Sequence, residues 1–421
     1  MTTLKTNGIP GMALIVLLIM ALAMALAGPA FGQVKERAST EELLQNLSHK
    51  DAKIRGEAAW ALGKSGDTRA IDPLIEALED NNSDVREWAV LALAKMGRPS
   101  IGPLSAALQS KGDMVRWQAA AALGLINDSN ATETLSNALQ SNNSTVRYWA
   151  AAALGQIKDN RSRSRSRDAL ISALGDLNET AREEAGWALR SVEGAGAADL
   201  LIKLLTDGDP NRRMGAAQAL GDLADLTAVM PLIEALQDLE AGVRSEAACS
   251  LGRLGDSQAT MPLIGILGDP EERVRREGIK ALTAIGRPAT DSLILALNES
   301  DNSTQEAASQ ALGNIGEERS VQPLIWAFKN GDSNVRHAAV TALAEINRSL
   351  AVTPFIQILG DPNLQSDLRA DAAFALGEMD DARAKEPLIF AMANDRDSSV
   401  RMKAAQALKS IGGVSVPEYS I

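Results

Sequence analysis

The sequence predicts an all-α protein, a right-handed α–α superhelical solenoid of about twelve helix pairs. A motif of about 31 residues returns along nearly the whole chain, and each copy holds two stretches with apolar residues at helical spacing. One pair of short helices cannot bury its apolar face, so successive pairs must stack and share a core. The 421 residues, which by length alone would suggest two or three domains, are therefore expected to form one repeat array.

The motif reads roughly A-x-x-P-L-I-x-A-L-x-D, followed by x-x-V-R-x-x-A-A-x-A-L-G-x-I-G-D. Gln305 replaces its arginine in the ninth copy, after the loop N-E-S-D-N-S-T, and we expect this junction to be the softest point of the stack. A residue that recurs in almost every copy describes the scaffold, so we expect the arginines to pair with the aspartate-rich loops in a structural ladder. They are Arg55, Arg86, Arg116, Arg147, Arg182, Arg213, Arg244, Arg275, Arg336, Arg369 and Arg401.

Both helices of a copy have recognisable ends. In the first helix Pro73 is expected in the first turn, where its missing N–H costs little. The second helix is expected to begin at an N-cap and to end at a glycine suited to a left-handed C-cap. The expected N-caps are Asp51, Ser83, Asp113 and Asp209, and the expected C-caps are Gly66, Gly255 and Gly316.

This pattern resembles the short HEAT-like repeats of the phycobilin-lyase type over residues 39–413, and the resemblance implies a solenoid whose second helices line the concave face. It indicates the architecture and not a function. Deoxyhypusine hydroxylases with HEAT repeats use paired His-Glu motifs to hold iron, and this chain has none. HEAT-like DNA glycosylases need a basic concave face, which the net charge of −12 does not suggest.

The N-terminal segment 1–32 has the order of a secretory signal: the charged Lys5, sixteen apolar residues over 12–27, and the small residues Ala30 and Gly32. A retained membrane anchor over residues 9–31 remains an alternative, because no charge follows Lys5 until Lys35.

Both alternatives place the repeat region, 33–413, and the short tail, 414–421, outside the cytoplasmic membrane. The protein is therefore expected to be secreted or anchored at the outer face of that membrane.

Asn-x-Ser/Thr sequences occur eleven times, which fits glycosylation of an exported chain. The alternative is that Asn, Ser and Thr coincide because all three favour helix caps and turns. The sites are Asn46, Asn81, Asn127, Asn130, Asn142, Asn143, Asn160, Asn178, Asn298, Asn302 and Asn347.

Composition argues against catalysis. The one cysteine, Cys249, cannot form an internal disulfide, and the two histidines are too few for most catalytic metal shells. No metalloprotease motif, phosphate-binding loop or Ser/His/Asp grouping occurs. We therefore expect no catalytic residue, metal or cofactor, and no nucleic-acid partner for this acidic chain.

Residues one, two and five positions after the repeat arginine vary between copies, and aromatic side chains gather there in the first five copies. Because variable positions on one face carry function in solenoids, we expect a binding stripe on the concave face, for a protein segment or a glycan. The alternative is that the rings pack between neighbouring helices. The stripe consists of Trp60, Trp88, Trp117, Tyr148, Trp149 and Trp187.

An insertion near residues 158–167 interrupts the period with alternating arginine and serine. It could form a basic finger that contacts an anionic surface, or a solvated loop of like charges. Its cations are Arg161, Arg163, Arg165 and Arg167.

Together these features predict an exported, non-enzymatic scaffold that binds proteins through the concave face. One alternative is an enzyme or enzyme accessory related to phycobilin lyases, which would bind a linear tetrapyrrole. A structural protein of the cell envelope, or a glycan binder, is the other alternative.

Overall fold

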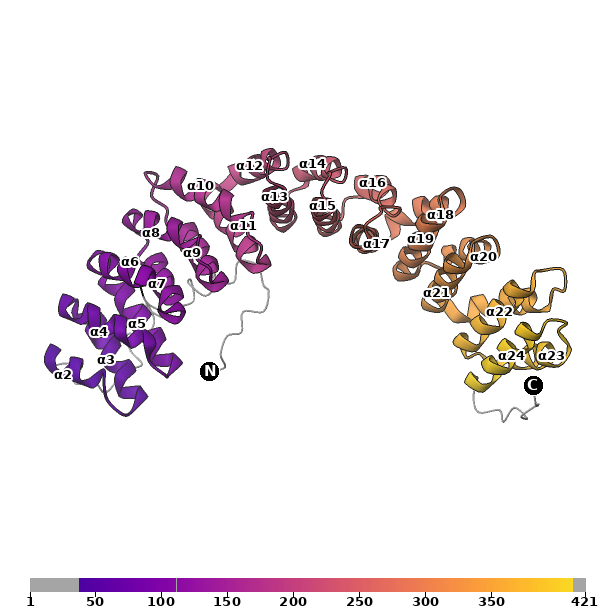
Figure 1. Cartoon of the computed structure of the whole chain (residues 1–421), viewed down its shortest axis with the longest axis horizontal. Coiled ribbons are helices and arrows are strands. Elements are labelled where there is room, and N and C mark those ends of the chain that lie inside the picture. The colour runs from indigo at the N-terminus through magenta and orange to yellow at the C-terminus, as the bar shows by residue number, and fades with distance from the viewer. Residues whose placement is uncertain (1–37, 111, 412–421) are drawn as a thin grey trace. The chain divides into compact units, whose positions relative to one another are not determined.

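The computed structural model describes residues 38–110 and 112–411, and this part of the chain is all α, with no strand (Figure 1). The expected fold class, a solenoid of stacked helix pairs, is confirmed. The expected signal segment, 1–32, and the tail, 414–421, lie outside the described residues. Contacts divide the chain into two compact units, Met1–Ala228 and Val229–Ile421, and each is described by itself below.

In the first unit each copy supplies a first helix and a longer second helix. The pairs are α2 (Thr40–Asn46) with α3 (Ala52–Ser65), α4 (Ile71–Glu76) with α5 (Ser83–Met96), α6 (Ile101–Ser110) with α7 (Asp113–Ile126), α8 (Thr132–Ala138) with α9 (Ser144–Gln156), α10 (Arg163–Ala173) with α11 (Glu179–Glu193), and α12 (Ala197–Leu204) with α13 (Pro210–Leu223).

The second unit continues the same pattern. Its pairs are α14 (Val229–Ala235) with α15 (Ala241–Leu254), α16 (Thr260–Gly265) with α17 (Glu272–Ile285), α18 (Thr290–Glu299) with α19 (Asn302–Ile315), α20 (Val321–Asn330) with the start of α21 (Ser333–Gly360), the end of α21 with α22 (Ser366–Met379), and α23 (Lys385–Asn394) with α24 (Ser398–Ser410). Helix α21 holds two helices because Asn347 has non-helical dihedrals, φ −165° and ψ 95°.

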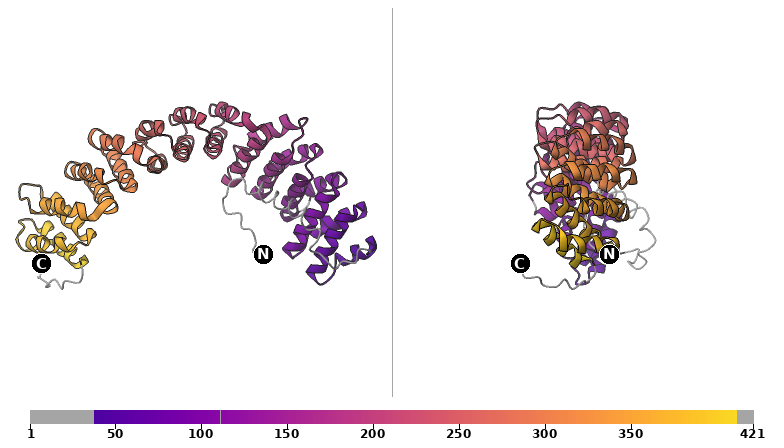
Figure 2. Two further views of the ribbon diagram at one scale, coloured as in Figure 1. Left: turned by 180° about the vertical axis from the view of Figure 1, so that it is seen from behind. Right: turned by 90° about the vertical axis from the view of Figure 1, so that its right-hand side faces the viewer.

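Short 3₁₀ turns lead into most first helices, and one extends α4. They are η1 (Thr68–Ala70), η2 (Ala77–Glu79), η3 (Arg98–Ser100), η4 (Ser129–Ala131), η5 (Gly194–Gly196), η6 (Leu226–Ala228), η7 (Ser257–Ala259), η8 (Arg287–Ala289), η9 (Glu318–Ser320) and η10 (Ala382–Ala384). Within each unit the first helices form one row and the second helices form another (Figures 1 and 2).

The expected helix ends are largely confirmed. Asp51 and Asp209 are N-caps that accept backbone N–H bonds, and Pro73 lies in the first turn of α4. Ser83 and Asp113 are each one residue inside the helix, because Asn82 and Gly112 precede them as N-caps. All three expected glycine C-caps, Gly66, Gly255 and Gly316, are left-handed, with φ between 67° and 77°.

The glycine of the A-L-G motif is where second helices approach most closely. A Cβ added at Gly63 would lie 2.5 Å from Cα of Ala92, and one added at Gly252 would lie 2.8 Å from Cα of Ala281. Contacts of this kind recur at Gly155, Gly313 and Gly377, each against an alanine of the next second helix. Small residues on both sides therefore set the spacing between copies, and the core around them consists of buried alanine and leucine.

Candidate binding site

The arginine ladder forms around aspartates in the loops between helices. The carboxylate of Asp80 accepts Nε and Nη2 of Arg55 at 2.6 and 2.7 Å, while its main-chain carbonyl accepts Nη1 of Arg86 at 2.8 Å. One aspartate thus joins the arginines of two successive copies. The same arrangement recurs at Asp176 with Arg147 and Arg182, at Asp269 with Arg244 and Arg275, and at Asp395 with Arg369 and Arg401.

Each of these four aspartates lies six residues before the repeat arginine of its own copy. In some copies another residue stands six positions before the repeat arginine. The repeat arginine of the preceding copy then pairs with a different group or lacks such an aspartate pair. Ser141 stands there in copy four, and Arg116 of copy three pairs with Asp113 on its own helix. The acidic loops therefore complete the ladder only where the aspartate falls at this position.

Repeat arginines also hold the loop of their own copy, and one of them reaches the next copy. Arg213 donates from Nη1 to the carbonyl of Asp207 at 2.9 Å, six residues earlier. Arg182 instead donates from Nε to Oε1 of the buried Gln218 on α13, in the next copy, at 2.7 Å. The expected structural role of the arginines agrees with these bonds, and the bond to the carbonyl six residues earlier is a recurrent contact that the sequence did not predict.

In the second unit Arg336 departs from the ladder, and a cavity opens beside it. Asn363 takes the aspartate position before Arg369, so the copy-eleven loop offers no carboxylate there. Instead Nε of Arg336 donates to Oδ2 of Asp371 on α22 at 2.7 Å. Asp371 lies two residues after Arg369, at one of the positions that vary between copies. Arg336 therefore reaches toward the face made by the second helices.

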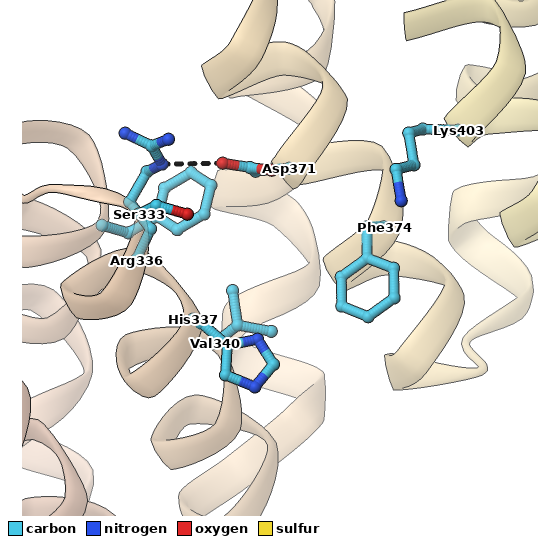
Figure 3. A pocket seen from close by; sticks show the side chains of 8 residues that line it. Ser333, Arg336, His337, Val340, Asp371, Phe374 and Lys403 are labelled. Carbon is cyan, nitrogen blue, oxygen red and sulfur yellow. Dashed lines mark hydrogen bonds and ion pairs between the residues drawn. The ribbon is translucent and has the colours of Figure 1, made fainter. Parts of the chain in front are cut away.

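The cavity is open, has a volume of about 210 Å³, and is lined by α20, α21, α22 and α24 (Figure 3). Two apolar side chains that line it, Phe328 and Val340, are buried. Three basic side chains contribute to its wall, with Asp371 the one acidic residue among those lining it. The basic residues are Arg336, His337 and Lys403.

Phe374 and Lys403 form the C-terminal wall. The Lys403 ammonium lies 5.3 Å from the centre of the Phe374 ring, a cation–π distance, and in the part of the chain that the structure describes no carboxylate forms an ion pair with this lysine. The Phe374 side chain is 37% exposed. The site therefore offers an open ring and a cation beside an apolar interior.

The expected aromatic stripe is not a uniformly exposed surface. Trp60 and Trp149 are only 6% and 7% exposed, contrary to the expectation, whereas Trp88, Trp117, Tyr148 and Trp187 are half-buried. The cause is ring packing between neighbouring second helices. The ring centres of Trp60 and Trp88 lie 5.5 Å apart. Trp117 stacks on Trp149 with ring centres 5.4 Å apart and 28° between the ring planes. A binding role for the half-buried rings remains a prediction.

The basic finger does not project as a separate loop. Residues from Arg163 onward form the start of α10, with Ser162 and Ser166 buried against the stack. Arg163 donates to the carbonyl of Val192 at 2.7 Å, Arg161 pairs with Asp159, Arg165 with Glu133 and Arg167 with Asp168. The C-terminal part of the insertion therefore belongs to α10. Each of the four arginines of the insertion contacts a different partner.

Cys249 is half-buried, and burial raises the pKa of its thiol, which disfavours the reactive thiolate. Across residues 38–110 and 112–411 no cluster of three or more His, Cys, Asp or Glu side chains is arranged to hold a metal ion. No helix in that same part of the chain is long and apolar enough to span a membrane.

The sequence reasoning missed Asp371 and Phe374 because it followed the tryptophans. Both occupy variable positions after Arg369, and Phe374 is the one Phe, Trp or Tyr at these positions in copies seven to twelve. The interval from Arg336 to Arg369 is 33 residues, longer than most, which marks the altered loop. These two signals together point to the cavity.

The fold and its ladder define an α-helical repeat protein built from stacked helix pairs. Family comparison agrees: the model described as HEAT repeats matches residues 20–94, 40–115, 101–190, 167–248, 229–295, 290–366 and 352–419. The chain belongs to the HEAT-repeat family.

A curated relative, "Uncharacterized phycocyanin operon protein Z" of Pseudanabaena tenuis (strain PCC 7409), is 33% identical over 89 residues. The match covers 21% of this chain and 44% of the relative, so the chain spans less than half the length of that protein.

Solved structures that are similar to this chain match it at low identity. The complex of CpcE and CpcF of phycocyanin lyase from Nostoc sp. PCC7120 is 22% identical, covering 60% of this chain and 96% of that chain, with a TM-score of 0.30. Kap121p bound to RanGTP is 14% identical, covering 96% of this chain and 53% of that chain, with a TM-score of 0.44. Importin beta is 14% identical, covering 95% and 64%, with a TM-score of 0.43.

Proposed function

We propose that this protein is an exported, non-enzymatic scaffold that binds a protein partner on the face formed by its second helices. The observation that carries the proposal is the open cavity around Phe374, which lies at the positions where the copies differ. Residues shared by every copy build the stack, so selectivity must come from residues that differ. The proposal places the contact in Val229–Ile421 and not on the tryptophans of the first copies.

The solvent exposure of the fifth residue after each repeat arginine supports placing the contact in Val229–Ile421. The fifth residue after the arginine is buried in copies one to four, for example Trp60 and Ala121. From copy eight onward the same position is exposed to solvent. Its residues there are Lys280, Gln310, Thr341, Phe374 and Gln406.

The test is site-specific photo-crosslinking in the native cell, with a photoreactive phenylalanine analogue in place of Phe374. The control carries the analogue in place of Phe390, which is exposed on the first helix α23. We expect one discrete adduct from position 374 that is absent from position 390. Equal labelling from both positions, or no adduct from position 374, contradicts the proposal.

Export rests on the N-terminal segment 1–32, whose sequence has the order of a secretory signal. Fractionation of cells that express the full chain tests it, since an exported protein is accessible to protease added outside the cytoplasmic membrane. Protection from protease in intact cells contradicts export. Intact mass measured on the same material also tests glycosylation, because a mass equal to the bare mature chain excludes attached glycan.

A second candidate is an accessory function in phycobilin attachment, favoured by the relative named after the phycocyanin operon. If this candidate holds, the purified full chain binds a linear tetrapyrrole, with a shifted absorption band and a raised melting temperature. Unchanged absorbance and melting temperature exclude it and leave the scaffold function untouched.

A further inference from the structure

We infer that the cavity in Val229–Ile421 recognises an extended acidic peptide that carries an apolar side chain next to a carboxylate. The inference rests on the proposed scaffold function and names the chemistry of its ligand.

The charge of the cavity is opposite to that of the chain. The protein as a whole carries −12, yet the charged residues lining this cavity are Arg336 and Lys403 against the single Asp371. Asp371 is already engaged by Arg336. The Lys403 ammonium has a ring beside it but no carboxylate paired with it among the described residues, so a carboxylate from a ligand would complete its surroundings.

The shape requires an apolar group beside that carboxylate. Phe374 presents an accessible ring, and the buried side chains of Phe328 and Val340 line the same cavity. A ligand that brought only charge would leave the ring in water, whereas an apolar side chain next to the carboxylate covers it. A volume of about 210 Å³ suits one side chain and not a large cofactor.

The repeat spacing favours an extended peptide over an isolated small molecule. Neighbouring packed helices lie ~8–10 Å apart and an extended chain advances ~3.3 Å per residue, so every third residue of a peptide would meet the next copy. The exposed Lys280, Gln310 and Thr341 occupy the same repeat position as Phe374 in preceding copies. A peptide anchored at the cavity could therefore continue along the row.

The experiment uses the full chain and two labelled, end-blocked octapeptides, Gly-Ser-Gly-Phe-Glu-Gly-Ser-Gly and the same peptide with Gln in place of Glu. Fluorescence anisotropy measures both affinities. We expect the Glu peptide to bind at least tenfold more tightly, and the difference to shrink as salt is added. Equal affinity for both peptides at low salt overturns the inference.

Variants assign the effect to the cavity. Lys403→Gln is expected to bring the two affinities within twofold, and Phe374→Ala to weaken both at least tenfold. Matched controls on first helices, Lys329→Gln and Phe390→Ala, are expected to leave both affinities within twofold of the starting protein. A control that loses as much as its cavity counterpart contradicts the assignment.

One variant is expected to gain affinity, which a merely damaged fold would not do. Asp371→Asn removes the carboxylate that competes for Arg336, so the Glu peptide should bind about threefold more tightly and the Gln peptide unchanged. Weaker or unchanged binding of the Glu peptide contradicts the inference. If photo-crosslinking from position 374 captures a partner while these peptides show no preference, the ligand chemistry is wrong and the scaffold function stands.

Discussion

Arg55 and Asp80 form a two-pronged ion pair between successive copies, and Asp80 also accepts a hydrogen bond from Arg86 through its main-chain carbonyl. Both charged side chains are only 12% exposed, so the pair is shielded from water. Asp80 additionally accepts the backbone N–H of Asn82 at 2.8 Å, which shapes the loop before α5. A single residue therefore fixes a loop, a helix start and the contact between two copies.

Replacing this aspartate should cost more stability than replacing an exposed one. Asp80→Asn removes the charge and leaves Arg55 without its carboxylate, so we expect a loss of about 2 kcal/mol in the free energy of unfolding. The control, Asp72→Asn on the exposed side of α4, is expected to change it by less than about 0.5 kcal/mol. Urea unfolding followed by circular dichroism measures both, and equal losses would contradict a structural role for the pair.

The same pair predicts how the cost of Asp80→Asn depends on pH. The hydrogen bond from Arg55 holds the pKa of the Asp80 carboxyl below its ordinary value of 3.8. A carboxyl whose pKa is lowered by folding contributes stability that is present above its unfolded pKa and lost as pH falls through its folded pKa. The difference between the starting protein and Asp80→Asn should therefore be constant above about pH 5 and should shrink below pH 3.8.

Urea midpoints of both proteins between pH 3 and pH 7 check this. Arg55→Gln serves as the control background. Without Arg55, the cost of Asp80→Asn should depend much less on pH, because the cation that lowers the pKa of Asp80 is gone. A difference that grows as the pH falls would show that Asp80 is not the titrating group.

Much of this architecture could be predicted from the sequence, and the exceptions have physical causes. The arginine and the small A-L-G residues recur because every copy repeats the same contacts, so the period reveals the stack. The expectation of accessible rings was wrong for Trp60 and Trp149. An aromatic side chain at a variable position can still be large enough to pack against the neighbouring helix. The pairing of Arg336 with Asp371 beside the cavity was missed because Asn363 stands where an aspartate would complete the ladder, and sequence patterns draw attention to residues that are present.

The glycine of the A-L-G motif should resist even the smallest substitution. At Gly252 an added Cβ would lie 2.8 Å from Cα of Ala281, which forces α15 and α17 apart. We expect Gly252→Ala to lower the free energy of unfolding by about 1–3 kcal/mol, despite the better helix propensity of alanine. Gly265→Ala, in α16 with nothing within 4 Å of the new Cβ, should be neutral or stabilise by up to about 1 kcal/mol. Equal effects of the two substitutions would contradict the packing explanation.

Ring burial makes a separate prediction for the tryptophans. Trp149 is 7% exposed and stacks on Trp117, so Trp149→Ala should cost about 3–5 kcal/mol of unfolding free energy. Trp326 is 42% exposed on α20, and Trp326→Ala should cost no more than about 1 kcal/mol. Far-UV circular dichroism during urea unfolding gives both values without relying on the fluorescence of the removed ring. A small loss for Trp149→Ala would revive the idea of a loosely held binding stripe.

The junction between copies nine and ten lacks both members of the ladder pair. Gln305 replaces the arginine and Asn330 replaces the aspartate six residues before Arg336. The described contacts across this junction include a hydrogen bond from Nδ2 of Asn302 to Oδ2 of Asp332 at 3.0 Å, but no arginine–aspartate pair between these two positions. We therefore expect amides of α19 to exchange hydrogen faster than those of α17, as measured by mass spectrometry.

Restoring the pair provides the stronger test, since it should raise stability only when both residues are present. Gln305→Arg alone places a cation without a partner, and Asn330→Asp alone removes an amide that donates to the carbonyl of Trp326 at 2.8 Å. Together they should recreate the contact seen between Arg55 and Asp80, with a coupling energy of about 1–2 kcal/mol in a double-mutant cycle. Slower exchange in α19 should accompany that gain. Additive effects of the two substitutions would mean that the missing pair does not explain the softness of this junction.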